Sequence, residues 1–253
     1  MLGETRNLTP SEPRRSSIRP PSPLWIGVAA VTVIVAGIGL RIGVPIYRQQ
    51  MAIREVERLG GSVGMNPVGP EWLQRRVGSI FPALFANVLR VDLSDTDADD
   101  ATLAHLEAFP HLYRLKLSRT RVTDTGLAHL EGLTELGWLN LYGTQVSDAG
   151  LVHLQRLTRI ERLVLGRTAV TNAGVAHLTG LTELGWLILD DTAVTDSGLE
   201  HLKGNARLYR LSLVGTDVSD AAIADLTRPG LAILKPPAEA LNWSDARLWR
   251  ECE

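Results

Sequence analysis

Apolar residues recur along the middle of this chain in one arrangement that repeats every 24 residues between Val88 and about Leu234. Each unit begins with alternating leucines and ends with leucines at helical spacing, as in LYRLKLSRTRVTDTGLAHLEGLTE and LGWLNLYGTQVSDAGLVHLQRLTR. A fixed period of this length is typical of a solenoid, because so short a unit cannot bury its apolar face alone and must stack on its neighbours. The pattern therefore predicts six stacked units over residues 88–234.

The aligned units separate into columns with different physical roles. The alternating leucines, such as Leu112, Leu115 and Leu117, predict a short strand that faces the core. An unbroken threonine column follows the strand, and we expect its hydroxyls to bond backbone groups of the adjacent coil. Its members are Thr96, Thr120, Thr144, Thr168, Thr192 and Thr216.

A second polar column marks the start of a short helix. Its serine or threonine is a helix N-cap candidate, and the residue after it, usually aspartate, suits the positive end of the helix. The cap candidates are Thr123, Ser147, Thr171, Thr195 and Ser219. Each unit is therefore expected to contribute one strand and one short helix.

The pattern LxxLxLxxTxVTDxGLxxLxxL resembles the bacterial leucine-rich-repeat proteins whose units carry threonine where the commonest repeat has asparagine. The stretch from IREVERLGGSVG to PEWLQRRVG also resembles the membrane-proximal lead of a subset of them. The resemblance covers about residues 24–234 and implies an α/β leucine-rich-repeat solenoid, with parallel strands on its concave side and short helices on its convex side. For function it implies binding or scaffolding. The terminal units depart from the pattern, with Asp99 and Thr102 in the first and Ala222 in the last.

The sequence ahead of the repeats predicts a membrane anchor. Residues 1–23 contain five prolines and little apolar surface, which is typical of a disordered tail. Seventeen uncharged residues follow from Leu24 to Leu40, and apolar character resumes beyond Arg41 up to Tyr47. We expect residues 24–47 to form a single transmembrane helix, with Trp25 and Tyr47 near its ends. A cleaved signal peptide and a buried helix are the alternatives.

The remaining segments are expected to support and cap the repeats. Residues 48–87 predict a stalk helix that ends at Gly60 and Gly61, then a turn-rich stretch and a second helix opened by Pro70. Residues 235–253 predict a C-terminal cap or tail. Four arginines precede the apolar segment and four follow it, so the positive-inside rule does not orient it. We expect the repeats on the extracytoplasmic side of a bacterial membrane.

Charge and motifs exclude several functional classes. Residues 1–58 carry eight arginines against four glutamates, a charge of +4. Because the net charge of the chain is −2, the remaining residues carry −6, which argues against nucleic-acid binding by the repeats. The one cysteine, Cys252, allows no intramolecular disulfide. We find no G-x-S-x-G, H-E-x-x-H or Walker loop, so neither enzyme activity nor a cofactor is expected.

A histidine column raises the question of a metal site. It consists of His105, His129, His153, His177 and His201. Packed helices lie ~8–10 Å apart, whereas two ligands of one zinc ion must approach within about 4 Å of each other. We therefore expect no metal, and interpret the column as exposed residues copied with each repeat.

The predicted concave side holds the most promising functional residues. Its second column consists of Arg90, Arg114, Trp138, Arg162, Trp186 and Arg210, and the tyrosines beside it are Tyr113, Tyr142 and Tyr209. Neighbouring strands lie ~4.8 Å apart, so guanidinium and indole groups are expected to stack. Tryptophan and arginine are also common in interface hot spots. One hypothesis is a docking surface for a protein, peptide or glycan, and the other is a ladder that only stabilises the sheet.

Three functions fit these features. The first is a membrane-anchored binding module. The second is a structural scaffold of the envelope, and the third is a non-catalytic adaptor of a degradation or signalling complex on the cytoplasmic side.

Overall fold

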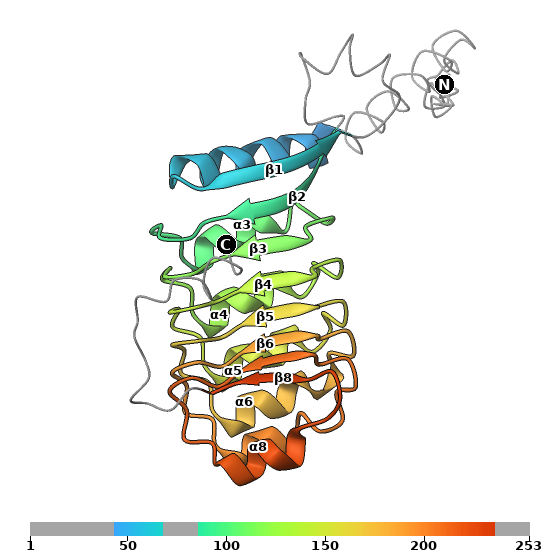
Figure 1. Cartoon of the computed structure of the whole chain (residues 1–253). Helices are drawn as coiled ribbons and strands as arrows, with labels where there is room; N and C mark the ends of the chain where they lie inside the picture. Colours follow the sequence, from blue (N-terminus) through green and yellow to red (C-terminus); the bar gives the residue numbers. More distant parts are fainter. Residues whose placement is uncertain (1–42, 68–85, 236–253) are drawn as a thin grey trace, which may run out of the picture. The chain divides into compact units, whose positions relative to one another are not determined.

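Strands contributed by successive coils of the chain lie side by side, in chain order, in one eight-stranded sheet (Figure 1). The computed structural model describes residues 43–67 and 86–235, and everything said of the fold concerns these residues. The strands are β1 (Ser62–Pro67), β2 (Ala86–Asp92), β3 (Arg114–Lys116), β4 (Trp138–Asn140), β5 (Arg162–Val164), β6 (Trp186–Ile188), β7 (Arg210–Ser212) and β8 (Ala232–Leu234). β1 is antiparallel to β2, and all later pairs are parallel.

A short helix follows each strand from β2 to β7 and returns the chain to the next strand (Figure 1). The helices are α3 (Asp100–Leu106), α4 (Asp124–Leu127), α5 (Asp148–Leu151), α6 (Asn172–Ala176), α7 (Asp196–Glu200) and α8 (Asp220–Leu226). Single 3-10 turns extend three of them, namely η2 (Ala128–Leu130), η3 (Val152–Leu154) and η4 (His177–Gly180). The predicted α/β leucine-rich-repeat solenoid is confirmed.

The core lies between the sheet and these helices. Leu112, Leu115 and Leu117, with their counterparts in the other units, are 0–2% exposed. The strand register matches the 24-residue repeat, since Leu115 pairs with Leu139 and Leu139 pairs with Leu163. Each sequence column therefore becomes a straight row across the sheet.

The threonine column closes turns within its own coil. Thr120 Oγ1 donates to the carbonyl of Leu117 at 2.7 Å, and Thr168 Oγ1 donates to Leu165 at 2.6 Å. The predicted bond to the adjacent coil is wrong, because the chain turns as it leaves the strand and brings the leucine carbonyl of the same coil within reach of the hydroxyl.

The aspartates at the helix starts do connect adjacent coils. Asp124 accepts hydrogen bonds from the amide and the hydroxyl of Ser147, one unit later, at 2.7 and 2.5 Å. The same forward link, the interunit Asp ladder, joins Asp100 to Thr123, Asp148 to Thr171, Asn172 to Thr195 and Asp196 to Ser219. The cap role is also present, as the Ser147 hydroxyl accepts from the amide of Ala149 at 3.3 Å.

The interunit Asp ladder explains the glycine of the repeat motif. A Cβ atom on Gly126, Gly150 or Gly174 would collide with the aspartate carboxylate of the preceding unit. The first unit has no predecessor among the repeats, and there Thr102 replaces the glycine and completes a capping box with Asp99. The departure at the first unit thus follows from the absence of a neighbouring carboxylate.

The first repeat is covered by segments that precede it. Residues 43–58 are helical, and Ala52, Ile53 and Val56 of this helix are 1%, 8% and 0% exposed within the common core. The part expected to be a stalk therefore packs on the solenoid. β1 formed where the sequence suggested only turns, because the free edge of β2 supplies hydrogen-bonding partners even to a segment rich in glycine and proline.

Several predicted segments fall outside the described residues. They are the tail over residues 1–23, most of the anchor over residues 24–47, the Pro70 helix, and the C-terminal segment after Lys235. In the part of the chain that is described, no helix combines the length and the apolar character needed to cross a membrane.

Candidate binding surface

The six residues of the predicted second column form one row across the face of the sheet that is turned away from the core. We call this side, the predicted concave side, the outer sheet face. The strand register pairs Arg90 with Arg114, and Arg114 with Trp138. It continues through Arg162 and Trp186 to Arg210. The structure therefore brings all six together, one per strand from β2 to β7.

The guanidinium groups of this row contact the indoles. Arg114 Cζ lies 2.9 Å from the centroid of the Trp138 ring, and Arg162 Cζ lies 5.8 Å from it. Trp186 has Arg162 at 5.0 Å and Arg210 at 4.3 Å. Each tryptophan thus has arginines on both neighbouring strands, an arrangement in which each pair contributes roughly 0.5–2 kcal/mol depending on desolvation.

Burial changes which groups this row presents to a partner. Trp138 is 8% exposed and Trp186 is 7% exposed, so the indoles are not open anchors. Arg90 is exposed, and Arg114, Arg162 and Arg210 are partly exposed. The accessible part of the row is therefore cationic, which sequence reasoning did not anticipate.

The three tyrosines each lie over a glycine of a neighbouring coil. A Cβ atom on Gly137 would collide with the ring of Tyr113, and one on Gly185 would collide with the ring of Tyr209. The ring of Tyr142 lies similarly close to Gly166. The Tyr113 hydroxyl donates to Glu161 at 3.2 Å, and burial, followed by the charge of Glu161, raises the pKa of Tyr113. These glycines make room for aromatic rings at the edge of the surface.

The last residue of each strand from β2 to β7 forms the next row on the outer sheet face. Lys116 and Asp92 make an ion pair at 3.2 Å at one end of the row. Farther along, Val164 and Ile188 pair across β5 and β6 and join Trp186 in a cluster separate from the main core. We call these three residues, with Tyr142 packed against them, the outer apolar cluster. The face is therefore basic near β2 and β3 and apolar near β5 and β6.

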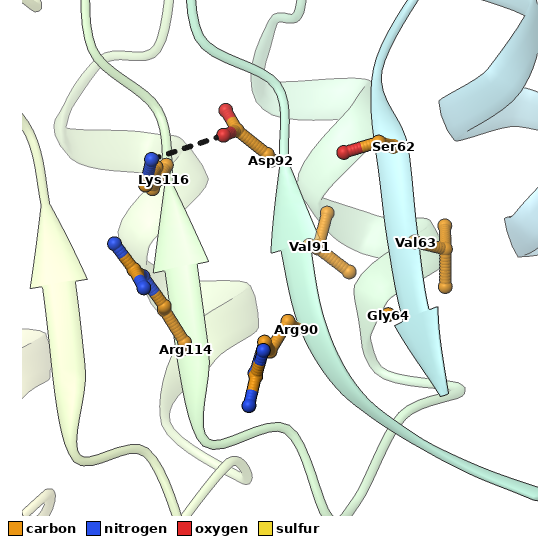
Figure 2. Close-up of a pocket in the computed structure, with 8 residues that line it drawn as sticks. All are labelled: Ser62, Val63, Gly64, Arg90, Val91, Asp92, Arg114 and Lys116. Carbon is orange, nitrogen blue, oxygen red and sulfur yellow. Dashed lines mark ion pairs between the residues drawn. The ribbon is translucent and has the colours of Figure 1, made fainter. Parts of the chain in front are cut away.

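A pocket of about 220 Å³ lies at the basic end, between β1, β2 and β3 (Figure 2). Its lining residues are Ser62, Val63, Gly64, Arg90, Val91, Asp92, Arg114 and Lys116. We call it the basic pocket, because it holds three cations and one carboxylate. Figure 2 shows the Arg90 and Arg114 side chains projecting from neighbouring strands on the same side of the sheet.

The two arginines of the basic pocket repel each other. They are direct partners in the β2–β3 register, a placement in which like charges destabilise a sheet. Burial, followed by the charge of Arg90, lowers the pKa of Arg114. A Cβ atom on Gly64 would lie 3.1 Å from Arg90 Cβ, so the glycine on β1 leaves the Arg90 side chain its space. An anion bound between the two guanidinium groups would relieve this repulsion.

A row of residues with left-handed backbone conformation follows the strands, and it was not predicted from the sequence. Asp95, Arg119, Gly143, Arg167, Asp191 and Gly215 have φ angles between 52° and 71°. Two ion pairs join members of this row across coils, Arg119 with Asp95 and, at 3.0 Å, Arg167 with Asp191. The sequence does carry a signal for this conformation, since this repeat position holds only glycine, arginine or aspartate.

Asp190 is a buried carboxyl group beside this surface. It is 7% exposed, and its Oδ1 accepts a hydrogen bond from the Val214 amide at 3.0 Å. Burial raises the pKa of Asp190 to about 6, although the Ser212 hydroxyl and the Val214 amide both act to lower it.

Three members of the histidine column, His129, His153 and His177, make hydrogen bonds to residues of the preceding unit. His129 Nδ1 lies 2.7 Å from Glu107 Oε1, and His153 Nδ1 lies 2.6 Å from Glu131 Oε1. His177 similarly contacts Gln155 at 2.9 Å. These contacts give the three central histidines a role in linking coils.

Comparisons with known proteins return structures of similar fold. No protein-family model and no curated protein matches the chain. An internalin, InlF of Listeria monocytogenes, is 24% identical with a TM-score of 0.46, over 53% of this chain and 37% of that one. Internalin C2 of the same organism is 19% identical, with a TM-score of 0.44 and coverage of 66% and 93%. The SOBIR1 receptor-kinase ectodomain of Arabidopsis thaliana is 13% identical, with a TM-score of 0.47 and coverage of 68% and 96%.

These likenesses concern the fold alone. The chain spans little more than a third of the InlF structure, and none of the three is as much as 25% identical. What the outer sheet face binds has to be argued from its own residues.

Proposed function

We propose that the repeats form a binding module whose outer sheet face docks an acidic segment of a protein or peptide. The observation that carries this proposal is the cationic row, in which Arg90 and Arg114 face each other across β2 and β3. Such a pair is unfavourable for the sheet alone, and an anionic ligand offsets the cost. If the row served only to stabilise the sheet, a tryptophan in place of one of these two arginines would stabilise it more than a second arginine does.

The proposal includes a membrane location. Residues 24–47 are apolar enough in sequence to anchor the module. We propose that the repeats lie on the extracytoplasmic side. A reporter fused after Glu253 tests this. Activity only in the cytosol would favour the adaptor of a cytoplasmic complex instead.

Photo-cross-linking in cells tests the docking surface. Tyr113 and Tyr209 on the outer sheet face are 44% and 49% exposed, and Val152 on the helical side is 45% exposed. Replacing each in turn by p-benzoylphenylalanine compares positions of equal accessibility. We expect protein adducts from the two tyrosine positions and none from position 152.

Charge variants make the test specific for an acidic partner. Arg162→Glu on the outer sheet face should remove the adducts, whereas the same change at the exposed Arg156 should leave them. Adducts of equal yield from both faces, or none from any position, would favour a scaffold without a docking surface.

A further inference from the structure

Six outward positions of β1, β2 and β3 form two short rows in the basic pocket. Across the strands, the first row is Gly64, Arg90 and Arg114, and the second row is Ser62, Asp92 and Lys116. Directly opposed residues and residues two apart on one strand share a face of a sheet, so these positions surround one hollow (Figure 2). Its volume is about 220 Å³, and Gly64 contributes no side chain to fill it.

The charges around this hollow match a doubly charged anion. Arg90, Arg114 and Lys116 bring three positive charges and Asp92 brings one negative charge, which leaves +2. A phosphate group carries about −1.5 to −2 at pH 7. A single carboxylate of an acidic segment would leave one of the positive charges unmatched. Arginine also suits phosphate, because the N–H groups of a guanidinium bind its oxygens in pairs.

Asp92 is the member of the pocket that can distinguish one anion from another. Its Oδ1 accepts a hydrogen bond from the Ser94 amide at 3.0 Å, and its Oδ2 lies 3.2 Å from Lys116 Nζ. Burial acts to raise the pKa of Asp92, but the hydrogen bonds from Ser94 and Lys116 outweigh it and hold the pKa below its ordinary value. The carboxylate is therefore ionised near neutral pH, where it accepts hydrogen bonds and donates none. An anion in the pocket gains from Asp92 only if it brings a proton of its own.

The negative charge of Asp92 is not needed for the local turn. Asn140, at the equivalent position two units later, accepts a hydrogen bond from the Tyr142 amide through Oδ1 at the same 3.0 Å. The ion pair of Asp92 with Lys116 is partly exposed to solvent, and such pairs contribute little to stability. The charge at position 92 therefore matters more for what the pocket binds than for the fold.

We propose that the basic pocket is a selective site for a phosphate group that carries a proton, and that Asp92 selects it by accepting the hydrogen bond of the P–O–H group. Arg90 and Arg114 donate to the remaining phosphate oxygens. Hydrogenphosphate keeps one proton at neutral pH, and a phosphate monoester, whose second pKa is about 6, keeps one on part of its molecules. Sulfate and carboxylates have no proton to share there, so Asp92 repels them. This inference rests on the proposed function, because it names the anionic group that the outer sheet face takes at its basic end.

Competition between phosphate and sulfate tests the selectivity, because the two ions have similar shape and charge and differ in the proton. Equilibrium dialysis of the full-length protein in detergent measures the binding of radiolabelled inorganic phosphate, with unlabelled phosphate or sulfate as the competitor. We expect sulfate to compete roughly 10- to 100-fold less well, since it meets the Asp92 carboxylate without a hydrogen bond to offer. Equal competition by the two ions, or no binding of phosphate, would overturn the proposal.

Variants assign the selectivity to named side chains. Asp92→Asn should bring sulfate to within about twofold of phosphate, because an amide can donate a hydrogen bond to either ion. Arg90→Gln should weaken the binding of phosphate roughly tenfold, whereas Arg156→Gln, at an exposed position outside the pocket, should leave it unchanged. Asparagine at position 92 can keep the turn bond, as Asn140 does, and circular dichroism checks the fold of each variant. Sulfate that is still rejected by Asp92→Asn would overturn the role of Asp92.

Two peptides distinguish a phosphorylated side chain from free phosphate. One is a short capped peptide with a central phosphoserine, and the other is the same peptide with glutamate in that place. Stronger competition by the phosphoserine peptide than by inorganic phosphate would support the proposal with an esterified ligand, and the reverse order would support it with the free ion. A glutamate peptide that competes as well as the phosphoserine peptide would overturn it.

The outcomes separate this inference from the proposed function. Photo-adducts from Tyr113 together with equal competition by phosphate and sulfate would sink the phosphate site and leave the docking surface standing. Selective binding of phosphate without any photo-adduct would leave the phosphate site standing and remove the protein partner.

Discussion

The carboxylate of Asp148 accepts hydrogen bonds from the amide and the hydroxyl of Thr171, at 2.7 and 2.6 Å, although the two residues belong to different units. This contact ties α5 to the start of α6. Gly174 permits it, because a Cβ atom there would collide with the same carboxylate. The helical side of the solenoid is therefore joined by side chains as well as by its apolar core.

Asp148→Ala should lower the free energy of unfolding by about 1–3 kcal/mol, because it leaves the Thr171 amide without its partner. Asp148→Asn should cost less, since Asn172 already makes the equivalent bond to the Thr195 amide at 2.8 Å. Urea titration of the full chain in detergent measures both. The exposed Asp217 is the control, and an equal loss from Asp217→Ala would contradict the interunit role.

Gly137→Ala should destabilise the protein by about 1–3 kcal/mol, because the new methyl group overlaps the ring of Tyr113. Removing the ring with Tyr113→Ala should make the second change, Gly137→Ala, nearly neutral. A double-mutant cycle by urea denaturation measures this coupling. Gly132→Ala, at a position where nothing lies within 4 Å, is the matched control. Additive losses at positions 113 and 137 would show that the glycine serves another purpose.

The repeat period allowed the sheet, the core and the alignment of the arginine–tryptophan row to be predicted, because each depends only on residues 24 apart being equivalent. What the period could not reveal was which groups of successive coils touch. The bond from Thr120 to its own coil and the link from Asp124 to the next coil both depend on backbone direction at a turn. Likewise, Trp138 and Trp186 were expected to be accessible. Their burial depends on side-chain packing, which the repeat pattern of the sequence does not reveal.

Val56→Ala should lower the free energy of unfolding by about 2 kcal/mol, because this side chain is 0% exposed where the N-terminal helix covers the first repeat. The neighbouring Glu57 is exposed and provides the control. Urea titration of Val56→Ala and Glu57→Ala compares the two. If Val56→Ala changed stability no more than Glu57→Ala, the helix would not act as a cap of the core.

Asp190→Asn should stabilise the protein at pH 7 and change its pH dependence. The pKa of Asp190 is about 6 in the folded protein against 3.8 as its ordinary value, so the folded state holds a proton that the unfolded state has lost between these pH values. The contribution of Asp190 to the free energy of unfolding is therefore fully present below pH 3.8 and is lost as the pH rises through about 6. Asparagine is neutral throughout and keeps an oxygen that accepts from the Val214 amide.

A pKa difference of about two units corresponds to roughly 3 kcal/mol, which is the upper limit of the gain expected from Asp190→Asn at pH 7. Urea titrations of the wild-type protein and the variant between pH 4 and 8 measure it, and the gap between them should close towards pH 4. The exposed Asp217→Asn is the control for a general charge effect. A gap that stays constant with pH would show that Asp190 is ionised in the folded protein across this range, and that the hydrogen bond from the Val214 amide compensates for the burial of its carboxylate.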